Sequence, residues 1–227
     1  PSKTPRVTPT PTPTPTLVYS ATPTPEDEFA FTIVVEENGW SRYTYPASDF
    51  SISVSPKWVH FDLGVDDFDE MLAEIDRNHP GVAQLYSVEY IRYVTNMGMK
   101  FLVIDVSAIE YGEKTDLNIV VSDLKYDIDF DTYVSENIQV LKEEYGTYLN
   151  VEEKRIQMAG VETAELIYEL ETVSAEEEST IVVVVQYLLI AADDEMAYVL
   201  TFTTLEDTFE AKYPQILEIA QSLKLSD

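Results

Sequence analysis

The sequence predicts an α+β domain, and more specifically an α/β/α sandwich in which helical layers cover a central antiparallel sheet. Segments with apolar residues at every second position alternate with segments in which they recur every three or four positions. In addition, residues 181–192 are apolar at nearly every position, so both faces of that segment must be covered. We therefore place this segment at the centre of the sheet.

The composition changes sharply near residue 26, and this change divides the chain in two. Residues 1–25 contain eight Pro, eight Thr and no acidic residue, whereas residues 26–227 hold all 42 Asp and Glu. From Thr8 to Thr16 the two residue types alternate strictly, and such a segment favours an extended polyproline-II rod of about 3.1 Å per residue. We predict a Thr/Pro-rich extended linker over residues 1–25 and one domain over residues 26–227.

The first half of the domain reads as short strands followed by two helices. Asn38-Gly39 and Pro56 mark turns between or after the strands, and Asp66 is a suitable N-cap for the first helix. His79-Pro80 separates this helix from the second. The expected strands cover residues 29–35, 40–45 and 50–54, and the expected helices cover residues 68–75 and 82–96.

The second half of the domain predicts a sheet, with one helix between its strands and one helix after the last strand. Gly146 is placed to end the inserted helix, and Pro214 limits or kinks the first turns of the appended one. Four successive strands connected by short turns predict an antiparallel meander. The expected strands are 101–106, 117–121, 151–158, 161–172, 180–192 and 196–204, and the helices are 130–145 and 206–223.

Three segments resemble the PsbP-like family: Tyr45–Trp58, Gly160–Tyr168 and Tyr213–Leu223. The resemblance spans most of residues 40–225 and implies an α/β/α sandwich built on an antiparallel sheet. The family includes extrinsic photosystem subunits, bacterial surface lipoproteins and a nuclear-transport factor. The resemblance implies no catalytic residue for this chain, and a shared fold does not supply a function.

Composition excludes several classes of function. A formal net charge of −28 argues against binding to nucleic acid or to an anionic membrane. The absence of cysteine excludes disulfides and thiol chemistry, and the apolar run 181–192 is too short to span a bilayer. His60 and His79 have no second histidine nearby, and no nucleophile, phosphate-loop or zinc-hydrolase motif is present. We therefore expect no enzymatic activity; a carboxylate-dependent enzyme is the least favoured of the hypotheses.

The Thr/Pro linker and the acidic domain together favour a tethered protein outside the cytoplasm. Thr-Pro repeats are typical of stalks that hold a domain away from a surface. We expect a binding or assembly module on a bacterial cell surface or secreted, with another envelope or extracellular protein as its partner. Membrane contact would come only through a lipid anchor upstream of Pro1. The alternative is a structural subunit of an extracellular assembly, in which the N-terminal arm packs on a neighbouring subunit and a homo-oligomer forms.

Two sets of residues are candidates for contacting a partner. Tyr86, Tyr90 and Tyr93 recur on the helix predicted over residues 82–96, where they either form an exposed stripe or cover one face of the sheet. Leu17, Val18 and Tyr19 interrupt the polar linker, and such a segment can dock on a neighbouring subunit by strand addition.

One acidic segment is a candidate metal site. Asp127, Asp129 and Asp131 alternate, so in an extended chain their carboxylates point the same way and calcium would relieve their repulsion. Thr132 and Ile138 stand where an EF-hand loop needs Gly and Glu, so that motif is excluded. The competing interpretation is that Asp129 or Asp131 caps the helix that follows. No other cofactor is expected.

Overall fold

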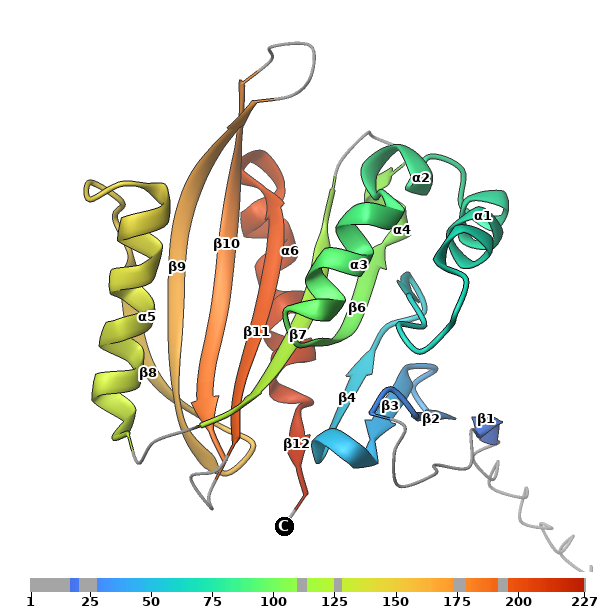
Figure 1. Cartoon of the computed structure of the whole chain (residues 1–227), viewed down its shortest axis with the longest axis horizontal. Coiled ribbons are helices and arrows are strands. Elements are labelled where there is room, and N and C mark those ends of the chain that lie inside the picture. Colours follow the sequence, from blue (N-terminus) through green and yellow to red (C-terminus); the bar gives the residue numbers. More distant parts are fainter. Residues whose placement is uncertain are drawn as a thin grey trace, which may run out of the picture.

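A computed structural model describes residues 17–20, 28–109, 114–124, 128–173, 179–191 and 196–226 (Figure 1). The fold is α+β, with helices packed on antiparallel sheets, as predicted. Residues 1–16 and 21–25 of the predicted linker lie outside the described residues. Within the described part of the chain, no helix combines the length and apolar character needed to cross a bilayer.

A seven-stranded antiparallel sheet forms the body of the molecule, in the strand order β5-β6-β7-β11-β10-β9-β8. Its last four strands in sequence form the predicted meander, and the valine-rich strand β10 lies between β9 and β11. Both faces of β10 are covered along most of its length, as its continuous apolar sequence requires. The strands are β5 (Trp58–His60), β6 (Met99–Asp105), β7 (Asp116–Asp123), β8 (Glu152–Met158), β9 (Val161–Val173), β10 (Ser179–Ile190) and β11 (Met196–Leu205).

A second, five-stranded sheet gathers the first strands of the chain and its end, which the sequence did not indicate. Its order is β1 (Leu17–Ser20), β2 (Thr32–Val35), β3 (Ser41–Tyr45), β4 (Phe50–Val54) and β12 (Lys224–Leu225). The turn Pro46–Ser48 connects β3 to β4. The segment Leu17-Val18-Tyr19 lies in β1, which pairs with β2 of its own chain. Docking of these three residues on a neighbouring subunit stays a prediction.

Helices cover both faces of the large sheet. On one face, α6 (Glu206–Gln221) packs beside the five-stranded sheet over a core that includes Val185, Tyr187 and Phe202. The helices on the opposite face form two separate clusters, one on β6 and one on β9 and β10. The first cluster contains α1 (Phe68–Asn78), α2 (Val82–Leu85) and α3 (Val88–Asn96), with the short helix α4 (Val106–Ile109) at its border, and the second contains α5 (Phe130–Tyr145).

The helix predicted over residues 82–96 is wrong in one respect, because it is broken into α2 and α3 at Tyr86. Tyr86 has extended backbone angles, which turn its ring into the core, where its hydroxyl donates to Asp116 at 2.8 Å. Ser87 then begins α3, and its hydroxyl accepts a hydrogen bond from the amide of Tyr90. A buried hydrogen bond and a new N-cap therefore favour the break.

His60 ends β5 within a cluster of aromatic rings. Its Nε2 lies 2.7 Å from the Tyr45 hydroxyl, and its ring centroid lies 4.7 Å from that of Tyr43 and 4.8 Å from that of Phe31. Burial of the ring disfavours the charged imidazolium and lowers the pKa of His60 to about 3. His60 is therefore a neutral, half-buried residue in contact with core aromatic rings.

This low pKa predicts that His60 makes the fold sensitive to mild acid. Between about pH 6.5 and pH 3 the unfolded chain binds a proton at His60 that the native state excludes, so the free energy of unfolding falls as pH falls. The slope approaches about 1.4 kcal/mol per pH unit for one such group. Urea unfolding from pH 6.5 to pH 5, where most carboxylates stay ionised, measures this slope.

The matched variant is His60→Gln, which keeps a hydrogen-bonding group near the Tyr45 hydroxyl but does not titrate. We expect the variant to be less stable at pH 7 but to lose less stability than the wild type between pH 6.5 and pH 5. Equal slopes in the two proteins would contradict a neutral His60.

Candidate functional site

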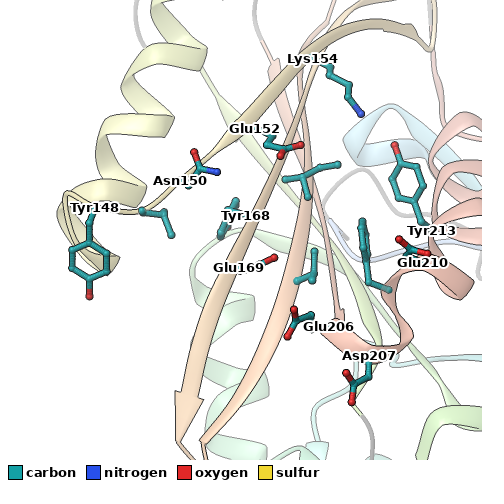
Figure 2. Close-up of a pocket in the computed structure, with 14 residues that line it drawn as sticks. Tyr148, Asn150, Glu152, Lys154, Tyr168, Glu169, Glu206, Asp207, Glu210 and Tyr213 are labelled. Carbon is teal, nitrogen blue, oxygen red and sulfur yellow. The ribbon is translucent and has the colours of Figure 1, made fainter.

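A cleft of about 830 Å³ lies between α6 and the outer strands of the large sheet (Figure 2). It lies between the first two turns of α6, the strands β8, β9 and β10, and the segment that leads from α5 into β8. Its lining combines acidic, aromatic and aliphatic side chains with one lysine: Tyr148, Leu149, Asn150, Glu152, Lys154, Ile167, Tyr168, Glu169, Val183, Glu206, Asp207, Phe209, Glu210 and Tyr213.

Beneath this cleft lies Glu165, a carboxylate with only 2% of its surface exposed. The hydroxyl of Tyr213, from α6, donates to its Oε1 at 2.7 Å, and the hydroxyl of Tyr187, from β10, donates to the same atom at 3.0 Å. The ammonium of Lys154 lies 3.6 Å from Oε2. The buried charge is thus compensated on both oxygens, and these contacts fix α6 to the sheet.

The two tyrosines keep their protons over the whole physiological range. Burial, followed by the hydrogen bond to Glu165, raises the pKa of Tyr213 to about 12. Burial and the same carboxylate raise the pKa of Tyr187 well above its ordinary value. Both hydroxyls therefore remain donors to Glu165, and neither is available as a base.

Five carboxylates line the cleft, and they outnumber its single lysine. Glu206, Asp207 and Glu210 come from the start of α6, where the first two also stabilise the positive end of the helix dipole. Glu152 and Glu169 come from β8 and β9. Apolar and aromatic side chains lie among them (Figure 2). A cleft of this kind suits a ligand with positive charges and an apolar component.

The other two buried acids of the described residues have structural partners. Asp105 accepts hydrogen bonds from Ser107 and pairs with Lys212 of α6. Asp116 accepts from Tyr86 and lies 3.2 Å from the ammonium of Lys114. Both carboxylates are thereby compensated inside the protein.

The structure separates the three tyrosines that were predicted to act together. Tyr86 is buried, so its placement in an exposed stripe is wrong; the break between α2 and α3 turns it inward. Tyr90 and Tyr93 lie on α3 with 37% and 63% of their surfaces exposed. Lys114 contacts the faces of Tyr86 and Tyr90, with its ammonium 4.7 Å and 5.0 Å from the ring centroids. The sequence could not reveal that pairing because Lys114 is far away in the chain.

The acidic segment 127–131 is described only in part, because Asp127 lies outside the described residues. Asp129 is the N-cap of α5, and its carboxylate accepts from the amide and the hydroxyl of Thr132. These bonds lower the pKa of Asp129. Asp131 lies 3.0 Å from the guanidinium of Arg155. The helix-capping interpretation is confirmed for Asp129, and calcium binding stays a prediction.

The cleft was not predicted from the sequence, although two signals were present. In β9 the residues Thr163 and Glu165 share the alternating positions of Val161 and Ile167, a pattern that places a carboxylate on a covered face. The acidic residues at the start of α6 were a second indication. Nothing in the sequence pattern indicated that the two would meet.

Comparisons with known proteins bear on the fold alone. No protein-family profile matches the chain, and no curated protein matches it in sequence. Among solved structures, the cyanobacterial PsbP protein CyanoP from Synechocystis superimposes with a TM-score of 0.50 at 12% identity, over 82% of this chain and 92% of that one.

Two further structures superimpose less closely. LpqN, a protein involved in cell envelope biogenesis of Mycobacterium tuberculosis, gives a TM-score of 0.47 at 10% identity over 78% of this chain and 83% of its own. The Ran-binding protein Mog1p of Saccharomyces cerevisiae gives 0.45 at 11% identity over 88% and 97%. The likeness to CyanoP confirms the expected PsbP-like fold, and identities this low transfer no function.

We predict that Glu165 holds α6 to the sheet through its hydrogen bonds. Glu165→Ala leaves the hydroxyls of the buried Tyr187 and the half-buried Tyr213 without their acceptor and opens a cavity, so it should lower the free energy of unfolding by about 3 kcal/mol. Glu165→Gln retains an acceptor and should cost about 1 kcal/mol. Urea unfolding measures both values, and equal losses in the two variants would show that packing, not the acceptor, matters at this position.

Proposed function

We propose that this protein is a non-enzymatic, extracytoplasmic binding module whose cleft holds a basic segment of another envelope or extracellular protein. The observation that carries the proposal is the set of five carboxylates that line the cleft together with aromatic and aliphatic side chains. Apolar surface provides affinity through burial, while a charged rim steers the partner and selects its sign. The high net negative charge of the whole chain also attracts a positively charged partner.

The proton chemistry of the cleft favours binding over catalysis. A general acid or base must be free to exchange a proton with a substrate. Glu165 instead accepts from Tyr187 and Tyr213, whose pKa values are raised, so this network holds its protons. We therefore do not assign a carboxylate-dependent reaction to this site.

The composition of residues 1–25 supports a location outside the cytoplasm. Alternating Thr and Pro suit an extended spacer that presents the domain at a distance from a surface. A lipid anchor upstream of Pro1 would supply the attachment, and the acidic cleft would then meet its partner away from the bilayer. Self-assembly through the N-terminal arm is the alternative organisation.

A flexible cationic peptide tests whether the cleft recognises positive charge. Acetyl-Lys-Gly-Lys-Gly-Lys-Gly-Lys-amide is titrated against the full chain by fluorescence anisotropy at about 0.15 M salt, where distant charges are screened. The double variant Glu206→Gln/Glu210→Gln should weaken binding about fivefold to tenfold, because exposed charge pairs contribute roughly 0.5–0.7 kcal/mol each.

The matched control is Glu70→Gln/Glu74→Gln on α1, which removes the same charge at exposed positions remote from the cleft (Figure 1). Its affinity for the peptide should change less than about twofold. If both double variants weaken binding equally, the peptide responds only to net charge, and the cleft is not the binding site.

A further inference from the structure

The last residues of strand β9 are paired on one side only. Its inner edge pairs with β10 from Thr163 to Val173. Its outer edge pairs with β8, but β8 begins at Glu152, which lies opposite Ile167. Residues 168–173 therefore have no partner strand on their outer edge within the described part of the chain. In an antiparallel strand about half of these residues direct their amide and carbonyl groups to that edge.

This open edge adjoins the cleft. Ile167, Tyr168 and Glu169 line the cleft, and so do Tyr148 and Asn150 from the segment that precedes β8. Figure 2 shows Tyr148 and Asn150 on the side of β9 away from α6, with Glu206 and Glu210 on the other side. An added strand along this edge would thus have one of its faces toward α6 and the other toward the end of α5.

The two faces of the edge have different chemistry. Glu169 and Glu171 are exposed and share the face of the sheet that carries α6, and Glu169 lines the cleft together with the carboxylates at the start of that helix. Tyr168 and Leu170 share the opposite face and pack in the cluster that contains Leu149. An added strand would therefore meet negative charge on one face and apolar surface on the other.

The charges also oppose the pairing of two copies of this chain. Edge-to-edge association of two β9 strands would bring glutamates of one copy against those of the other, and like charges placed opposite one another destabilise a sheet. A strand with Lys or Arg at alternate positions would instead gain cross-strand ion pairs. The unpaired edge of β9 therefore favours pairing with a basic strand and disfavours pairing with the same edge of a second copy.

We propose that the outer edge of residues 168–173 binds an extended segment of the partner by strand addition. The segment alternates Lys or Arg with apolar residues: the basic side chains face Glu169 and the start of α6, and the apolar ones face Tyr148 and Tyr168. This inference rests on the proposed function and specifies the backbone conformation and sequence pattern of the partner.

The probe is acetyl-Lys-Val-Lys-Tyr-Lys-Val-Lys-amide, which has the charge of the Lys-Gly peptide but favours an extended strand. It should bind the full chain at least about tenfold more tightly than the Lys-Gly peptide, because its apolar residues are buried and less order is lost on binding. The same peptide with its internal amides N-methylated keeps its charge and side chains but lacks strand donors, and its affinity should fall by about tenfold.

Hydrogen exchange measured by NMR gives a residue-specific readout. Amides of residues 168–173 that point to the outer edge should exchange at least about tenfold more slowly with the probe bound, whereas the amides bonded to β10 should change little. The Glu206→Gln/Glu210→Gln variant should weaken this binding, and the Glu70→Gln/Glu74→Gln variant should not.

The outcomes separate this inference from the proposed function. Suppose that the three peptides bind with equal affinity, that the Glu206→Gln/Glu210→Gln variant weakens each of them, and that the amides of residues 168–173 gain no protection from hydrogen exchange. The cleft then recognises charge alone, and strand addition is overturned. If no peptide shows binding that depends on the cleft carboxylates, the proposed function is overturned together with this inference.

Discussion

The position of α6 is the constraint on which the rest of this structure depends. Neighbouring residues of the helix reach two buried carboxylates on different strands: Lys212 pairs with Asp105 of β6, and Tyr213 donates to Glu165 of β9. The helix is therefore held at two points across the sheet, in addition to its apolar contacts with the core. A buried charge is costly unless it is compensated, so each anchor favours one orientation of the helix over its alternatives.

This orientation creates the cleft. Because Tyr213 is held against β9, the first two turns of α6 extend beyond it and bring Glu206, Asp207 and Glu210 opposite β8 and β9. The same acidic residues stabilise the start of the helix, so their presence at the cleft is compatible with the stability of the fold. The start of α6 carries the charges that select a partner, and the adjacent strand β9 has an unpaired edge that can bind the partner's backbone.

Local sequence patterns predicted some features of the candidate site and not others. Asp129 was predicted as a helix cap and is one, because capping depends on residues three positions apart. Helical spacing left two interpretations open for the three tyrosines, an exposed stripe or cover for the sheet. Tyr86 follows the second, and its hydrogen bond to Asp116, which joins residues 30 positions apart at the break in the helix, could not be read from that spacing. The cleft was not predicted, since its walls come from four separate segments of the chain.

The sequence by itself determined the α+β class and the central place of β10 through the spacing of apolar residues within each segment, and the antiparallel meander through the short turns between successive strands. Only the tertiary structure decided that the early strands form a second sheet with β12, and that β8 stops short of the end of β9. Strand partners and strand ends depend on contacts between distant segments. Periodicity within one segment carries no information about such contacts, and in this protein they form the candidate binding surface.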